Sequence, residues 1–147
     1  MRKILFFDDE DFITKYLIKS LQEFYGWKGD KQIVFVSTIN DVLSEINSEE
    51  EYDLFVLDVM ATPFLEELKK LFSQNEFDEA CFGMSVGFVL AKRIRGMKKY
   101  QRVPILFFTA SQSPYISEFE KGITAYIRKP ASPEKLSRKM NELLDNT

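Results

Sequence analysis

The spacing of apolar and polar residues along the chain predicts strands that alternate with helices. Short apolar runs bounded by polar residues predict five strands, at 2–7, 31–36, 54–57, 103–108 and 124–128. Apolar residues at helical spacing predict helices at about 11–24, 39–46, 63–72, 85–97 and 133–146, with a short one near 114–120. Strands and helices in this alternation form a parallel sheet with right-handed crossovers. The class is therefore α/β.

Local signals mark where several of these helices begin and end. Gly26 is a stop for the helix at 11–24, and Thr38, three residues before Asp41, resembles a capping box. Ser132 is an N-cap that is followed by proline at the first helical position. In the first helix, the apolar spacing predicts that the buried face consists of Ile13, Tyr16, Leu17, Leu21 and Phe24.

The stretch between the third strand and the helix at 85–97 is unusually long. Pro63 opens a segment with apolar residues at i, i+4, i+7 and i+8, which predicts a short amphipathic helix over 63–72. Residues 73–80 are polar and acidic, and we interpret them as a loop. The helix at 85–97 has a basic end, which either complements the helix dipole or forms a docking patch. Its basic residues are Lys92, Arg93, Arg95, Lys98, Lys99 and Arg102.

Four of the predicted strands end in residues that can carry chemistry. Asp8 and Asp9 follow the first strand, and Asp58 follows the third. Thr109 follows the fourth strand, and Lys129 follows the fifth. Taken singly, each has a plain alternative as a helix cap, a strand-end hydroxyl or a surface lysine. Because ligands bind beyond the carboxyl ends of strands in open α/β sheets, their joint occurrence predicts one shared site.

Composition limits the chemistry of that site. The 147 residues are 45% hydrophobic and suit a single domain, 1–147, with a sizeable core. The chain has no histidine and one cysteine, which excludes histidine-based zinc sites, histidine general bases and an internal disulfide. A net charge of −3 does not point to a polyanionic partner, and neither a signal peptide nor a membrane-spanning run is found. We expect a cytoplasmic protein without membrane partners.

The three aspartates favour a hard cation. Carboxylates crowded at neighbouring strand ends repel one another unless a cation lies among them. Mg²⁺ fits, because it binds through a few carboxylates and keeps several waters. A carboxylate beside Mg²⁺ can attack a phosphoryl donor to give an aspartyl phosphate. Lys129 and the Thr109 hydroxyl can then hold the phosphoryl oxygens, and the small Ala110 leaves room for the group to enter.

These motifs together resemble those of a response-regulator receiver domain, the phosphoacceptor half of two-component signalling. The resemblance covers the whole chain and depends on the pair Asp8–Asp9, on Asp58, on Thr109–Ala110 and on Lys129–Pro130. It implies a flavodoxin-like, doubly wound five-stranded parallel sheet of order 2-1-3-4-5, with helices on both faces. It also implies that the Lys129–Pro130 peptide bond is often cis.

The resemblance implies a role for each residue. Asp58 would be phosphorylated, and Asp8, Asp9, Asp58 and the backbone carbonyl of Met60 would hold Mg²⁺. Thr109 and Lys129 would contact the phosphoryl oxygens.

Tyr126 would swing inward on activation as Thr109 moves, although a plain strand aromatic is the alternative. The face formed by the short helix near 114–120, the last strand and the last helix would then change and bind a partner. The implied phosphodonor is a sensor histidine kinase or a histidine phosphotransfer protein. The output partner is unknown, and a homodimer is one candidate assembly. The chain would not be an enzyme, apart from self-catalysed phosphotransfer and autodephosphorylation.

Residues 61–82 depart from the resemblance. Receiver domains have a short loop between the phosphoacceptor and the next helix. In this chain, Met84–Gly87 resembles the end of that loop but lies about twenty residues further along the sequence than expected. We interpret 61–82 as a helical insertion at the rim of the site. Its apolar face packs on this domain, on a second copy or on a partner, or else the insertion covers the site as a lid.

Other functions fit the sequence less well. A receiver-like interaction module that is never phosphorylated and acts through the insertion is the main alternative, but the intact site residues argue against it. Phosphatases with an aspartate nucleophile usually need a second aspartate two residues later, where this chain has Met60. Nucleotide binding lacks a glycine-rich phosphate loop. Direct nucleic-acid binding would rest only on the basic end of the helix at 85–97.

Overall fold

The computed structural model describes residues 1–146 except 62, 64, 83–84, 111–118 and 120–122. The strands are β1 (Arg2–Phe7), β2 (Lys31–Val36), β3 (Leu54–Leu57), β4 (Ile105–Thr109) and β5 (Thr124–Arg128). The helices are α1 (Asp11–Phe24), α2 (Ile39–Ile46), α3 (Leu65–Leu71), α4 (Gln74–Phe82), α5 (Val86–Arg95), the 3₁₀ turn Lys98–Tyr100 and α6 (Pro133–Asp145). Within this described part, no helix is both long and apolar enough to cross a membrane. The helix expected near 114–120 falls almost wholly outside it.

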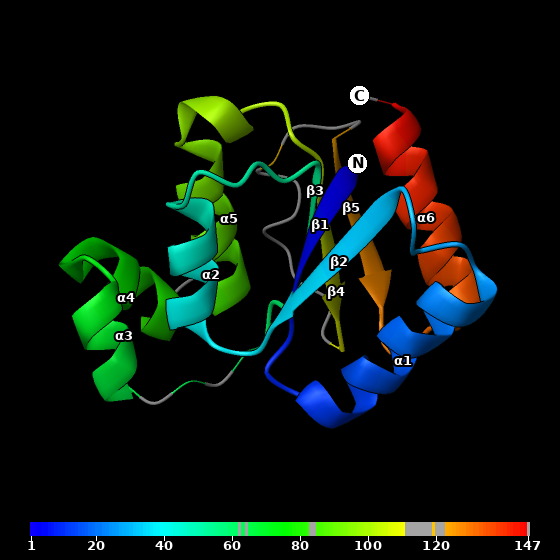
Figure 1. Ribbon diagram of the computed structural model, residues 1–147. Coiled ribbons are helices and arrows are strands. Elements are labelled where there is room, and N and C mark those ends of the chain that lie inside the picture. Colours follow the sequence, from blue (N-terminus) through cyan, green and yellow to red (C-terminus); the bar gives the residue numbers. More distant parts are fainter. Residues whose placement is uncertain (62, 64, 83–84, 111–118, 120–122, 147) are drawn as a thin grey trace.

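All five strands pair in parallel in the order β2-β1-β3-β4-β5, which confirms the predicted fold class. Figure 1 shows α2 and α5 on one face of the sheet and α1 and α6 on the other. The strand order changes direction at β1, with β2 on one side and β3 on the other. The carboxyl ends of β1 and β3 therefore lie side by side, where ligands bind in doubly wound folds.

Alternating residues of the central strands divide the core into two layers. On β1, Leu5 and Phe7 pack with the buried residues of α2 and α5, whereas Ile4 and Phe6 pack with those of α1 and α6. Successive side chains of a strand point to opposite faces, so a strand covered on both faces must be apolar throughout. β3 and β4 meet this requirement, because all of their residues are buried. The first charged residue after such a run therefore marks the edge of the sheet.

The predicted buried face of α1 is wrong in part. Ile13 is 69% exposed, Tyr16 64% and Phe24 76%. The face that packs on the sheet instead carries Thr14 and Ile18, together with Leu21 as predicted. Apolar spacing alone could not distinguish the two faces, because α1 is apolar on its solvent side as well. Together with Phe12, these exposed side chains form an apolar strip on the solvent side of α1.

Residues 73–80 were expected to be a loop, and this expectation is wrong, because α4 occupies Gln74–Phe82. The Ser73 hydroxyl accepts a hydrogen bond from the Glu76 N–H at 3.2 Å, and the Glu76 carboxylate accepts one from the Ser73 N–H at 2.9 Å. This reciprocal pair is a capping box, which starts a helix despite its polar composition. The helix predicted over 63–72 is shorter than expected, and Phe64 lies outside the described residues.

The two insertion helices pack on the same chain. Arg93 of α5 donates hydrogen bonds to the Glu76 carboxylate at 2.8 and 2.5 Å and to the Leu71 carbonyl at 3.3 Å. Its guanidinium also lies 5.6 Å from the ring centre of Phe72. Burial alone would raise the pKa of Glu76, but its bonds to Arg93 and Ser73 lower it. The buried side chains of Leu68 and Phe72 extend the core on the α5 side.

Much of the basic end of α5 is also occupied by contacts within the chain. Lys92 pairs with Glu79 at 3.1 Å, and Arg95 donates to the carbonyl of Tyr100 at 3.0 Å. Lys99 donates to the carbonyls of Ser48 and Glu50 at 2.9 and 3.2 Å. These contacts favour a structural role for the basic cluster over a docking patch.

Gly87, in the first turn of α5, lies directly against the end of β3. A Cβ atom added there would come within 2.3 Å of the Asp58 carbonyl oxygen and 2.5 Å of the Val59 Cα. The Gly87 N–H donates to the Val59 carbonyl at 3.2 Å. Only glycine allows the helix to start this close to the backbone that carries Asp58.

We expect Gly87→Ala to lower the free energy of unfolding by about 1–3 kcal/mol, the usual cost of overpacking a tight contact. Gly96→Ala, at the end of the same helix, is the matched control, because its added Cβ meets nothing closer than 3.4 Å. Urea unfolding of both variants beside the wild type measures the difference. Equal stability of the two variants would contradict this account of Gly87.

Candidate functional site

The predicted site residues lie at the carboxyl edge of the sheet because each follows the end of its strand. The Asp58 N–H donates to the Phe7 carbonyl at 3.0 Å, which places Asp58 beside Asp8. The Lys129 N–H donates to the Thr109 carbonyl at 2.8 Å. Asp8 and Thr109 are fully buried, and Asp58 is 4% exposed. These residues are therefore neighbours in space as well as at the ends of their strands.

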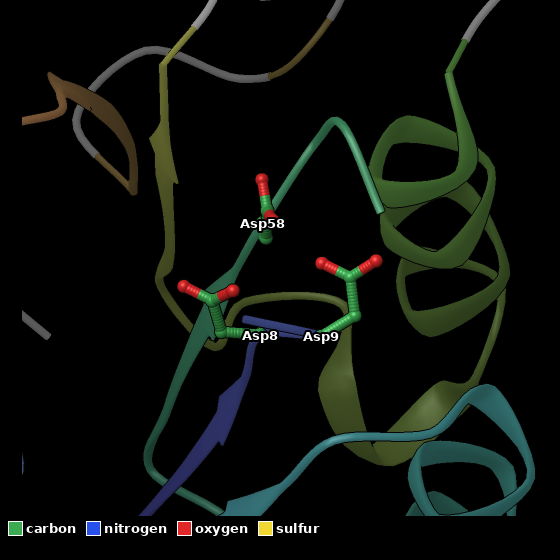
Figure 2. A group of neighbouring side chains, drawn as sticks. All are labelled: Asp8, Asp9 and Asp58. Carbon is green, nitrogen blue, oxygen red and sulfur yellow. The ribbon is translucent and has the colours of Figure 1, made fainter. Parts of the chain in front are cut away.

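Asp8, Asp9 and Asp58 form one acidic cluster, which Figure 2 shows at the adjoining ends of β1 and β3. One oxygen from each carboxylate can be chosen so that all three lie within 4.8 Å of one another. Lys129 contacts the cluster, with its Nζ 2.5 Å from Asp8 Oδ2 and 3.7 Å from Asp58 Oδ2. Three ionised carboxylates and one ammonium leave a net charge of −2, which a divalent cation would balance. An all-oxygen donor set of this kind fits Mg²⁺.

Asp8 is held in place by two hydrogen bonds. The Thr14 hydroxyl donates to Asp8 Oδ2 at 2.9 Å, and the Glu10 N–H donates to Asp8 Oδ1 at 2.9 Å. Thr14 is buried on the sheet-facing side of α1 and was missed by sequence reasoning. The one hint in the sequence was a hydroxyl residue in the first turn of the helix that follows Asp8 and Asp9. With Lys129, these donors satisfy a carboxylate that has no access to solvent.

Burial raises the pKa of Asp58 from 3.8 to about 6. Lys129 and the Met60 N–H lower the pKa, the latter by donating to Asp58 Oδ1 at 3.0 Å, whereas the charges of Asp8 and Asp9 raise it. The cluster therefore holds Asp58 partly protonated near neutral pH when no cation is bound. A divalent cation at this place would favour the ionised form, which is the nucleophilic one.

Three further predicted positions lie around the cluster. The Met60 side chain is 48% exposed, and ligation of a cation by its carbonyl stays a prediction. Thr109 is the last residue of β4, and its contact with a phosphoryl group also stays a prediction. Tyr126 pairs with Phe107 across β4 and β5 and is half-buried against the α5-side core. The Lys129–Pro130 peptide bond is cis.

We expect Asp58 to contribute less to the stability of the metal-free protein as the pH rises from about 4 to about 6. Because the Asp58 pKa is higher in the folded chain than in the unfolded chain, the folded chain holds more protons in this window. Relative to an Asp58→Asn variant, the wild type should lose on the order of 1 kcal/mol over that rise. Chemical denaturation of both proteins in EDTA across the window measures this difference. Parallel stability curves would contradict the raised pKa.

Comparison with known proteins supports the resemblance to receiver domains that the sequence motifs suggest. No family model matches the chain. A chemotaxis protein CheY homologue of Campylobacter jejuni is 28% identical over 107 residues, which cover 71% of this chain and 73% of the relative.

Solved receiver domains have the same fold. A signal receiver domain of a histidine kinase from Syntrophus aciditrophicus superposes with a TM-score of 0.69 at 19% identity, covering 100% of this chain and 92% of the other. The BeF3-activated DrrB receiver domain gives 0.66 at 22% identity, covering 99% and 98%. The receiver domain of a Pseudomonas aeruginosa PAO1 sensor histidine kinase gives 0.63 at 17% identity, covering 98% of each chain, and holds a magnesium ion in its active-site cleft. Taken with the strand order and the acidic cluster, these similarities show that the chain has the fold of receiver domains, and they support a receiver domain of the type found in two-component signalling.

Proposed function

We propose that this chain is a phosphoacceptor response regulator in which Asp58 receives a phosphoryl group from a histidine kinase or a histidine phosphotransfer protein. The observation that carries the proposal is the cluster of Asp8, Asp9 and Asp58 with Lys129 in contact with it. A purely structural cluster of acids would not be expected to bury two carboxylates beside a third. We also propose that residues 1–147 form a single receiver domain located in the cytoplasm.

Phosphotransfer uses the chain's own residues in defined ways. A carboxylate oxygen of Asp58 bonds to phosphorus as the P–N bond of the donor's phosphohistidine breaks, and the electron pair stays on the imidazole nitrogen. Asp8, Asp9, Asp58 and the Met60 carbonyl would hold Mg²⁺, which would supply positive charge near the phosphoryl oxygens. Lys129 then turns from Asp8 toward the new phosphoryl group, and Thr109 donates a hydrogen bond to it. Tyr126 follows into the space that Thr109 leaves.

The resulting change of charge is the switch. The aspartyl phosphate biases two arrangements of the chain by local electrostatics, and an output partner binds one of them. The protein acts as a signalling phosphoacceptor rather than as a turnover enzyme, although it assists its own phosphorylation and dephosphorylation. The output partner and a homodimeric state stay open to experiment.

Incubation of the metal-loaded protein with acetyl phosphate should add one phosphoryl group, detected by intact mass. Asp58→Asn should gain none, because the attacking carboxylate is lost. Chelation of Mg²⁺ should abolish the gain in the wild type. A wild type that binds Mg²⁺ but never gains the mass would instead favour an interaction module that acts through the insertion.

The donor protein must supply the histidine, because this chain has none. The exposed strip of α1 fits that partner: Phe12 is 72% exposed and Ile13 69%, and Ile13 also lines a groove of about 310 Å³. The same groove is lined by Lys129 and Ala110, so it leads from the strip to the site. Apolar surface that extends to Lys129 of the site suits a helical protein that presents its phosphohistidine there.

Ile13→Ala should slow transfer from any histidine kinase that phosphorylates the wild type by about 10-fold, as expected for truncation of an apolar anchor. Its rate with acetyl phosphate should not change, since that small donor needs no docking surface. Phe24→Ala is the matched control, because Phe24 is equally exposed at the far end of α1. A kinase rate unaffected by Ile13→Ala, or slowed equally by both variants, would exclude docking on this part of α1.

A further inference from the structure

The insertion brings an additional carboxylate to the edge of the acidic cluster. Glu67 of α3 and Asp9 line the same hollow, which has a volume of about 120 Å³. Ser37 and Thr38, from the connection between β2 and α2, complete its polar wall. Asp9 is thus shared between the cluster that faces Asp58 and a hollow that faces the insertion.

Glu67 is held in position without a partner of its own. Its side chain is half-buried, and no hydrogen bond or ion pair joins its carboxylate to the described part of the chain. The next residue, Leu68, is 3% exposed and fixes this turn of α3 in the core. A half-buried carboxylate left unpaired beside a second carboxylate is unfavourable unless something positive or hydrogen-donating lies between them.

We propose that Glu67 is a positioning residue for the cation site, whose carboxylate accepts hydrogen bonds from water molecules bound to Mg²⁺. Mg²⁺ held by a few carboxylates keeps some of its waters, and those waters need acceptors. The hollow has room for several water molecules. The inference rests on the proposed function, because it assumes that Asp8, Asp9 and Asp58 hold the cation.

The packing of α3 on the domain does not explain why residue 67 is acidic. Arg93, which donates to the Leu71 carbonyl, and the buried Leu68 fix α3 on the domain, and neither contact needs an acid at residue 67. Glu66, the preceding residue of α3, is exposed and is not among the described residues that line the hollow. Of these two adjacent acids, only Glu67 faces the acidic cluster.

Glu67→Gln and Glu66→Gln form a matched pair, because each removes one negative charge from the same turn of α3. We expect calorimetric titration of metal-free protein with MgCl₂ to give about 10-fold weaker binding for Glu67→Gln, at the lower end of what loss of an outer ligand partner costs. Glu66→Gln should bind as the wild type does. Unfolding in EDTA should show that neither variant is destabilised.

Three other outcomes would contradict the role proposed for Glu67. If Glu67→Gln binds Mg²⁺ as tightly as the wild type, the positioning role is excluded while the proposed function stands. If both variants are weakened equally and the loss disappears at high salt, the effect is a general surface charge and the inference fails. If the wild type itself binds no Mg²⁺, the proposed function fails and this inference fails with it.

Discussion

The site depends on one electrostatic constraint, the confinement of three carboxylates at the adjoining ends of two parallel strands. β1 and β3 are neighbours in the sheet, so Asp8 and Asp58 cannot move apart without breaking the pairing. Both are buried, so water screens their repulsion only weakly. Neighbouring groups reduce the repulsion, because Lys129 pairs with Asp8 and the Thr14 hydroxyl donates a hydrogen bond to it. Burial also raises the pKa of Asp58, which favours its neutral form. A divalent cation would balance the charge that remains when all three carboxylates are ionised.

The sequence was sufficient for the strands and for the residues at their ends. Parallel strands end at one edge, so an apolar run that stops at Asp58 or Thr109 fixes the place of that residue in space. Thr14 could not be predicted, because its role depends on which face of α1 meets the sheet. That face was misassigned since Ile13 and Tyr16 are as apolar as the residues inside. Apolar spacing locates a helix but cannot separate a core face from an exposed apolar one.

The insertion shows a second limit of sequence reasoning. α4 begins with a capping box at Ser73 and Glu76, yet its polar composition predicts a loop. Its stability comes from Arg93, on a helix that follows it in the chain, and such a contact leaves no mark in the local pattern. Gly87 lets α5 keep its close contact with the end of β3. α5 therefore supports the backbone of Asp58 directly, although more than twenty residues separate the two in the sequence.

The two sides of the acidic cluster differ in chemistry, and this difference separates two tasks. On the α1 side, the groove that includes Ile13 and Lys129 is largely apolar and suits a protein surface. On the α3 side, the hollow that includes Asp9 and Glu67 is small and acidic, and suits hydrated cations. The hollow on the α3 side presents the carboxylates of Asp9 and Glu67, whereas the groove on the α1 side presents the Lys129 ammonium beside the Glu10 carboxylate. The α3 helix thus adds the negative charge of Glu67 on the side of the cluster where Asp9 lies.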